Sequence, residues 1–141
     1  MIDTLLNKKN PTSAIKKILI VDDDETSNFV AQKLLCNYNM EYEIYSYTNS
    51  LEALKYMLLM DDVELPDMIF LDINMPHLNG FEFLEKMKEY GLNEKVQVIM
   101  YTSSNSLADQ KSAQRYNNVI GYMEKPFSAQ AYGRMLDMSP R

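Results

Sequence analysis

Polar side chains that can do chemistry follow several of the short apolar runs in this chain. The run from Met68 to Leu71 leads directly into Asp72, and a proline follows four residues later. The pattern recurs where other apolar runs end on two carboxylates, on a hydroxyl or beside an amine. The residues at those positions are Asp22 with Asp23, Thr102, and Lys125.

Together these groups suit phosphoryl transfer. Carboxylates from two strands in one pocket repel each other, and a hard divalent cation such as Mg²⁺ relieves that repulsion. An amine and a hydroxyl beside them are donors suited to phosphate oxygens. Because phosphoryl transfer needs mainly a positioned nucleophile and stabilised charge, Asp72 could form an acyl phosphate held by the cation, Lys125 and Thr102.

Five strands alternating with five helices must position these groups. The first and third strands are expected from continuous apolar runs, which are typical of strands buried on both faces, and the second strand alternates instead. The expected strands cover residues 18–21, 41–47, 68–71, 96–101 and 119–123. The expected helices begin near residues 26, 50, 80, 105 and 128, and the last runs to about residue 138.

Helix ends and faces can be predicted from capping and spacing. We expect Thr26 or Ser27 to cap the first helix and Asp24 to add favourable negative charge at its start. Gly91 should end the third helix. The helix over 105–116 has few apolar residues, so we expect it to shift most readily. The apolar residues expected to face inward are Val30, Leu34, Leu35 and Tyr38, then Leu51, Leu54 and Leu58, then Phe81, Leu84 and Met87.

This order of elements is typical of a doubly wound α/β domain, with helices on both faces of a mostly parallel five-stranded sheet. Right-handed crossovers place the carboxyl end of every strand on one edge of that sheet. We therefore expect the carboxylates, the hydroxyl and the amine to meet at this edge, where open α/β sheets bind ligands.

Composition narrows the function classes. A chain of 141 residues, 46% hydrophobic and 24% charged, fits one globular domain. Its net charge of −6 argues against nucleic-acid binding, and no apolar run reaches the roughly 20 residues of a membrane span. The single cysteine, Cys36, cannot form an internal disulfide and is expected to be packed. Residues 1–10 lack a signal-peptide pattern, so we expect a cytoplasmic protein, and residues 1–14 are expected to form a flexible lead-in.

From about Lys16 to Met138 the chain resembles the receiver domain of two-component response regulators. The segments that carry the resemblance are Ile18–Asp24, Phe70–Pro76 with Gly80, Ile99–Thr102, and Lys125–Phe127. The resemblance implies a flavodoxin-like sheet with strand order 2-1-3-4-5, and a cis peptide bond before Pro126. We expect one receiver domain over residues 15–141 and no output domain.

The resemblance also implies a phosphoacceptor and a metal site. Asp72 would take a phosphoryl group from the phosphohistidine of a sensor histidine kinase or of a histidine phosphotransfer protein. Asp23 and Asp72 would bind Mg²⁺ directly, and Asp22 would help through water or a more distant contact. The backbone carbonyl of Asn74 would complete the protein ligands. The protein would be a switch with self-phosphorylation and dephosphorylation only, rather than an enzyme with a separate substrate.

In the family, phosphorylation is read out at one face. Thr102 and Lys125 would hold the phosphoryl group, and Tyr122 would turn inward as Thr102 moves toward it. The face would comprise the helix over 105–116, the last strand and the last helix, and we expect Tyr122, Tyr132 and Arg134 on or near it. A downstream protein target, or a phosphorylation-dependent dimer, would then recognise this face.

Three alternatives remain open on the sequence. The chain could relay the phosphoryl group to another histidine instead of binding a target. It could be a receiver-like interaction module that is never phosphorylated, although its complete set of acidic, hydroxyl and lysine residues argues against that. The segment Asp22–Thr26 also fits Asp-x-Asp-x-Thr, which resembles the haloacid dehalogenase phosphatases, with Asp22 as nucleophile and Asp24 as acid/base. The phosphatase hypothesis gives no role to Asp72.

Overall fold

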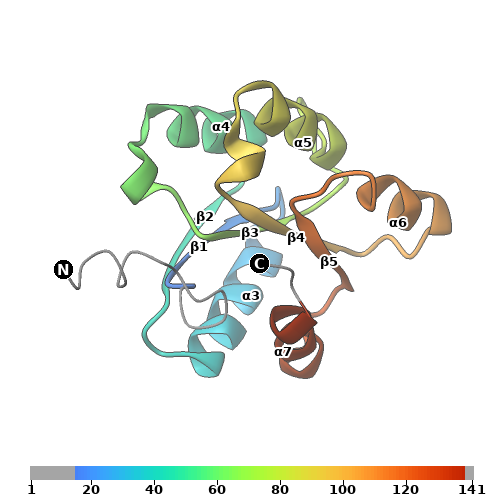
Figure 1. Cartoon of the computed structure of the whole chain (residues 1–141). Helices are drawn as coiled ribbons and strands as arrows, with labels where there is room; N and C mark the ends of the chain where they lie inside the picture. Colours follow the sequence, from blue (N-terminus) through green and yellow to red (C-terminus); the bar gives the residue numbers. More distant parts are fainter. Residues whose placement is uncertain (1–14, 139–141) are drawn as a thin grey trace.

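The computed structural model describes residues 15–138, so the lead-in expected over residues 1–14 lies outside the described residues. A five-stranded sheet forms the middle layer, with helices on both faces (Figure 1). The strands are β1 (Lys17–Val21), β2 (Glu43–Tyr47), β3 (Met68–Leu71), β4 (Gln97–Thr102) and β5 (Val119–Glu124). The helices are α3 (Glu25–Tyr38), α4 (Ser50–Leu59), α5 (Gly80–Glu89), α6 (Leu107–Ala113) and α7 (Ala129–Met138), with 3₁₀ turns η1 (Asp62–Glu64) and η2 (Leu92–Glu94).

All strand pairs are parallel and the strand order is β2-β1-β3-β4-β5, which confirms the predicted doubly wound sheet and its order 2-1-3-4-5. β3 lies in the centre and is buried along its whole length, as its continuous apolar run indicated. β2 lies at one edge and none of its residues is fully buried, since only Ile44 and Tyr47 are half-buried. The peptide bond before Pro126 is cis, as predicted.

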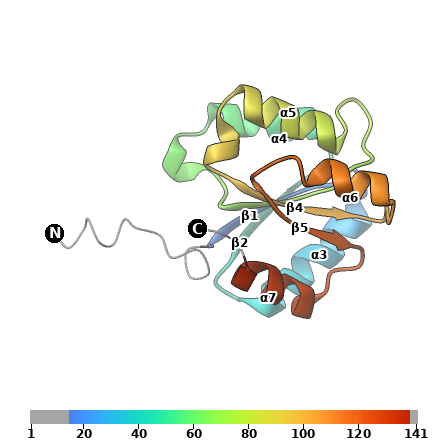
Figure 2. The same cartoon turned by 45° about the vertical axis from the view of Figure 1, so that its right-hand side comes forward.

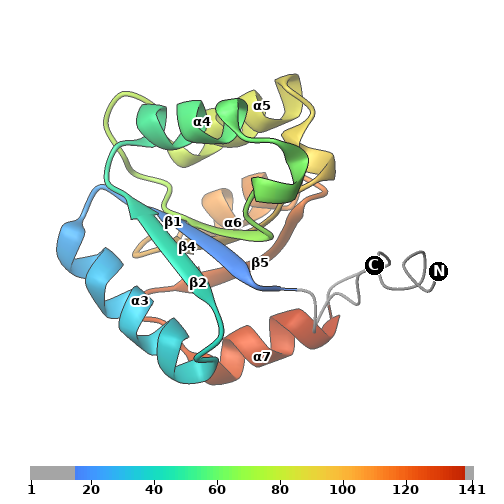
Figure 3. The same ribbon diagram turned by 90° about the vertical axis from the view of Figure 1, so that its left-hand side faces the viewer.

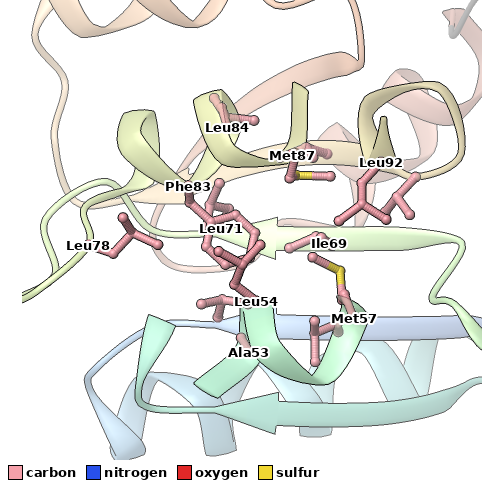
Figure 4. Packing of buried hydrophobic residues seen from close by; sticks show 14 of the residues in the cluster. Ala53, Leu54, Met57, Ile69, Leu71, Leu78, Phe83, Leu84, Met87 and Leu92 are labelled. Atoms are coloured by element: carbon pink, nitrogen blue, oxygen red, sulfur yellow. The ribbon is translucent and has the colours of Figure 1, made fainter. Parts of the chain in front are cut away.

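Alternate residues of each strand point to opposite faces of the sheet, so the sheet separates two hydrophobic cores. One core lies under α4 and α5 and includes Ala113 of α6, and the other lies against α3 and α7 (Figures 2 and 3). Figure 4 shows the first core, where Ile69 and Leu71 of β3 lie between Met57 of α4 and Phe83 of α5.

Three asparagine or aspartate side chains start the first three helices. The carboxylate of Asp24 accepts the backbone N–H groups of Thr26 and Ser27, at 2.9 and 3.2 Å, and so caps α3. The predicted caps, Thr26 and Ser27, were therefore wrong, while the placement of Asp24 at the helix start is confirmed. Asn49 caps α4, and Asn79 forms a capping box at the start of α5.

Several residues expected to face the cores are exposed instead. They are Val30 and Tyr38 on α3, and Leu51 and Leu58 on α4. Ala31 and Ala53 are fully buried in these two helices. Small side chains let a helix backbone lie close to the sheet, so large neighbours are displaced to the sides of the contact. Cys36, expected to be packed, is also exposed on α3.

The helix predicted over 105–116 is shorter than expected and spans Leu107–Ala113. Ser106 caps it by accepting the N–H of Asp109, which sets its start. Among residues 15–138, no helix combines the length and apolar character needed to span a membrane.

Candidate functional site

The predicted site residues meet at the carboxyl edge of the sheet. Asp22 and Asp23 follow β1, Asp72 follows β3, Thr102 ends β4, and Lys125 comes directly after β5. Asp22, Asp23 and Asp72 each place a carboxylate oxygen within 4.8 Å of the others, and we call these three residues the acidic pocket. The parallel topology thus brings together groups that lie up to about a hundred positions apart in sequence.

Asp22 forms the buried floor of the acidic pocket, with 1% of its surface exposed. One carboxylate oxygen, Oδ1, accepts the backbone N–H of Asp24 at 3.0 Å. The other, Oδ2, accepts the hydroxyl of Ser27 at 2.8 Å and lies 2.5 Å from Lys125 Nζ. The side chain of Asp22 is therefore held by three donors of the protein itself.

Asp72 is also buried and has its own donors. Its Oδ1 accepts the backbone N–H of Ile73 at 2.8 Å, and its Oδ2 lies 3.4 Å from Lys125 Nζ. Burial raises the pKa of the Asp72 carboxyl, and the charge of Asp22 adds to the increase; a hydrogen bond from Thr102 and the charge of Lys125 lower it, but only in part. Asp72 is thus held in a site where its negative charge is only partly compensated.

Lys125 is shared between the two buried carboxylates. Burial alone would lower the pKa of its amine, but the hydrogen bond to Asp22 and the charge of Asp72 outweigh burial and raise it. The amine therefore remains protonated and offers a fixed positive charge at the carboxyl edge.

The acidic pocket fits a hard divalent cation. Its donors are carboxylate oxygens, which Mg²⁺ prefers, and a cation there would offset the burial and the Asp22 charge that raise the pKa of Asp72. Asp23 is exposed, so the pocket opens to solvent on its side. Asn74 lies in the loop two residues after Asp72 and is likewise exposed.

Thr102 and Tyr122 are joined through Ser104, whose part between them the sequence does not indicate. The backbone N–H of Ser104 donates to Thr102 Oγ1 at 3.2 Å, and its carbonyl accepts the Tyr122 hydroxyl at 3.0 Å. The Ser104 hydroxyl donates to Asp109 in the first turn of α6 at 2.7 Å. The Tyr122 ring packs against the core beneath α4 and α5, and burial raises the pKa of its hydroxyl.

Sequence reasoning gave Ser27 no contact with the site, and it named Gly80 only as part of the family resemblance. Gly80, at the start of α5, donates its N–H to the carbonyl of Ile73 at 2.8 Å. A Cβ at this position would overlap the backbone carbonyl of Asp72, so only glycine fits against the loop that begins at Asp72. A glycine eight residues after Asp72 was a visible signal, whereas the role of Ser27 depends on which way its hydroxyl points.

Of the three residues expected on or near the readout face, Tyr122 is half-buried on β5, and the other two lie on α7. Arg134 is exposed on α7. Tyr132 is fully buried and stacks among Phe70, Phe127 and Tyr38, so its expected place on that face was wrong. The inner side of α7 lies directly on the sheet and needs a large side chain to fill the second core.

The geometry also bears on the phosphatase alternative. α3 begins at Glu25, one residue beyond Asp24, which leaves no room between them for an inserted flap. Asp24 Oδ1 is occupied by two backbone N–H groups of the helix. Asp24 is therefore committed to capping and is poorly placed to act as an acid/base.

Comparison with known proteins gives a consistent family. The model of the response regulator receiver domain matches residues 18–137. The chain is 26% identical to the sensor histidine kinase CheAY of Helicobacter pylori over 92% of its own length, but spans only 16% of that protein. It is 30% identical to sporulation initiation phosphotransferase F of Bacillus subtilis, covering 79% of this chain and 83% of the relative.

A solved structure supports the same assignment. A two-component response regulator from Cytophaga hutchinsonii superimposes with a TM-score of 0.77 at 28% identity, covering 87% of this chain and 95% of that one. The match of the family model to most of the chain, the sheet order and the acidic pocket agree. This chain belongs to the response regulator receiver domain family of two-component signalling.

Proposed function

We propose that this receiver domain accepts a phosphoryl group on Asp72 and uses it as a switch. The observation that carries the proposal is the position of the Asp72 carboxylate, which is buried, partly compensated and faces Lys125, Thr102 and the rest of the acidic pocket. A carboxylate oxygen of Asp72 attacks phosphorus and forms an acyl phosphate. The bond from phosphorus to the donor's histidine nitrogen breaks, and that nitrogen keeps the electron pair.

The residues of the site divide the remaining tasks. Lys125 and Thr102 donate to the oxygens of the transferred group, because both already face the Asp72 carboxylate. Asp23, Asp72 and the backbone carbonyl of Asn74 would hold Mg²⁺, with Asp22 acting through water. The bound cation supplies positive charge against the phosphoryl oxygens.

Switching follows from the contacts of Ser104. If Thr102 Oγ1 turns to the phosphoryl group, its contact with the Ser104 N–H is weakened, while the Ser104 carbonyl and hydroxyl remain tied to Tyr122 and Asp109. The shift therefore passes to β5 and α6. We propose the face formed by α6, β5 and α7, including Arg134, as the surface that a target protein or a second copy recognises.

The partner upstream is a phosphohistidine, carried by a sensor histidine kinase or a phosphotransfer protein in the cytoplasm. The relatives support this, since one is named a sensor histidine kinase and another a phosphotransferase. The second name also keeps a relay role open, in which Asp72 passes the group to another histidine. We assign the receiver domain to residues 15–141, and the protein to switching rather than to catalysis on a separate substrate.

The test is intact-protein mass after incubation with acetyl phosphate and Mg²⁺. We expect one phosphoryl adduct on the wild type, lost without Mg²⁺ and absent from Asp72→Asn. Asp61→Asn is the matched control, because Asp61 is exposed and its side chain makes no cap hydrogen bond. An adduct that persists in Asp72→Asn but disappears in Asp22→Asn would favour the phosphatase alternative. No adduct from acetyl phosphate or from a phosphorylated histidine kinase would favour the interaction module.

A further inference from the structure

Ser27 contacts the acidic pocket without belonging to it. Its hydroxyl donates to Asp22 Oδ2 at 2.8 Å, the same oxygen that faces Lys125 Nζ at 2.5 Å. Two donors thus share one buried oxygen, one from the helix that follows β1 and one from the loop that follows β5. Ser27 is half-buried, so its hydroxyl is partly shielded from competing water.

Residues at and just before the start of α3 donate hydrogen bonds to both the side chain and the backbone carbonyl of Asp22. Asp24 donates its N–H to Oδ1 at 3.0 Å, and the Asn28 amide donates to the Asp22 carbonyl at 2.9 Å. Ser27 supplies the one side-chain hydroxyl in this set. Because Asp22 is only 1% exposed, its orientation is set by these donors rather than by solvent.

The hydroxyl of Ser27 is separate from the helix cap. Asp24 is the cap, and it is the backbone N–H of Ser27 that reaches it. A substitution that removes only the hydroxyl leaves this cap in place. An effect of such a substitution on the acidic pocket would therefore come through Asp22.

We propose that Ser27 is a positioning residue that fixes Asp22 for divalent-cation binding and takes over Asp22 Oδ2 when Lys125 turns toward the phosphoryl group. Without the hydroxyl, Asp22 Oδ2 depends on Lys125 alone. The carboxylate then moves with the lysine and loses its fixed place relative to Asp23 and Asp72. This inference rests on the proposed cation site.

The test is the Kd for Mn²⁺, measured on the full chain without phosphodonor by calorimetry and by the loss of the free-ion resonance signal. Groups that orient metal ligands typically contribute about 10- to 100-fold in affinity, so we expect Ser27→Ala to weaken Mn²⁺ binding about 10-fold. Ser27→Thr keeps a hydroxyl and should bind Mn²⁺ about as tightly as the wild type. Ser27→Val has the shape of threonine without the hydroxyl and should bind as weakly as Ser27→Ala. Thr26→Ala, one position away and exposed, should bind as the wild type does.

A merely structural role predicts a different pattern. In that case the midpoint of thermal unfolding without cation would fall equally in Ser27→Val and Ser27→Ala, while the Kd of the folded protein would stay at the wild-type value. If the wild type binds Mn²⁺ and the Kd of Ser27→Val lies within twofold of the Kd of Ser27→Thr, the proposed role of Ser27 is overturned but the cation site is not. A wild type that binds no Mn²⁺ would overturn the cation site as well, so the two failures are distinguishable.

Discussion

At the scale of the residue, Lys125 balances two buried carboxylates. Its amine lies 2.5 Å from Asp22 and 3.4 Å from Asp72. Removing one partner of a buried ionic group leaves charge uncompensated, so we expect Lys125→Met to lower the free energy of unfolding by about 3 kcal/mol. Urea unfolding with and without Mg²⁺ measures this. Because the cation replaces part of the lost positive charge, Mg²⁺ should stabilise the variant more than the wild type.

Lys95→Met is the matched control for that prediction. Lys95 pairs with Asp62 at 3.0 Å, but both side chains are largely exposed, at 46% and 72%. Exposed pairs contribute about 0–1 kcal/mol, so this variant should unfold almost as the wild type does. Equal losses in the two variants, or no greater response of Lys125→Met to Mg²⁺, would show that Lys125 does not balance the pocket.

Tyr132 shows where single residues escape prediction from sequence. Its place in the last helix suggested a surface position, but the ring lies within the second core and its hydroxyl shares a 2.8 Å hydrogen bond with Tyr42. We expect Tyr132→Ala to cost about 3–5 kcal/mol through the cavity it leaves, and Tyr132→Phe about 1 kcal/mol through the lost hydrogen bond. Chemical denaturation of the two variants separates packing from polar contact. Similar losses in both would contradict this division.

At the scale of the element, replacing two different glycines with alanine should change the stability of the fold in opposite directions. An alanine methyl at Gly80 would overlap the backbone of Asp72 and force α5 away from β3. Overpacking typically costs about 1–3 kcal/mol, so we expect Gly80→Ala to destabilise the fold by roughly 2 kcal/mol. We also expect it to slow adduct formation on Asp72. Thermal unfolding and the mass assay measure the two effects.

Gly133, within α7, is the contrasting case. A methyl there would meet only the Tyr38 hydroxyl at 3.5 Å, an ordinary contact. Alanine stabilises a helix interior relative to glycine by about 0.5–1 kcal/mol, so Gly133→Ala should raise the unfolding midpoint. If the two variants shifted stability in the same direction, the close approach of α5 to the Asp72 loop would not be the cause.

Tyr116 lies three residues after the end of α6 and contacts α5. Its hydroxyl donates to Glu85 at 2.6 Å, and burial together with this contact raises the pKa of Tyr116 to about 12. A raised pKa means that the neutral phenol stabilises the folded state below pH 10 and that this contribution is lost as pH rises from 10 through 12. After allowance for solvent screening, we expect about 1 kcal/mol.

The measurement is the difference in unfolding free energy between the wild type and Tyr116→Phe across this pH range. The difference should favour the wild type at pH 9 and shrink by pH 12, and the subtraction removes the titration of other tyrosines. A difference that stays constant with pH would mean that Glu85 does not hold the phenol.

Strands could be predicted from sequence more completely than helix faces. A continuous apolar run such as Met68 to Leu71 can only be satisfied by burial on both faces, so its pattern is sufficient. Helices carry apolar residues on more than one side, and the side that packs depends on how closely the backbone approaches the sheet. On α4, Ala53 rather than Leu51 therefore faces the core. The spacing of large apolar residues could not indicate this.

At the scale of the whole molecule, the site was predictable because it follows from topology. Any chain with parallel strands and right-handed crossovers gathers its strand ends at one edge, so Asp22, Asp72 and Thr102 had to converge. The contacts made by Ser27 and Ser104 were not predictable in the same way. They depend on the rotamers of short hydroxyl side chains, which no periodic pattern encodes.

The sheet that gathers the site also divides the interior. Ile69 points into the core beneath α4 and α5, and Ile18 points into the core against α3 and α7, and both are fully buried. Each Ile→Val substitution should cost about 0.5–1.5 kcal/mol. Because the two side chains share no apolar partners across the sheet, their effects should add within about 0.5 kcal/mol in the double variant.

We expect the additive free energies to come with a single unfolding transition, because both cores pack on the same strands. We expect Ile18→Val, Ile69→Val and the double variant to lower the urea midpoint without changing the slope of the transition, as followed by circular dichroism and tyrosine fluorescence. A second transition in one variant would mean that one layer of helices can leave while the other stays. A coupling energy above 1 kcal/mol would mean that the sheet transmits packing changes between its faces. Packing changes on the side of the sheet that carries α6 would then be felt in the core against α3 and α7, and switching would reach α3 as well.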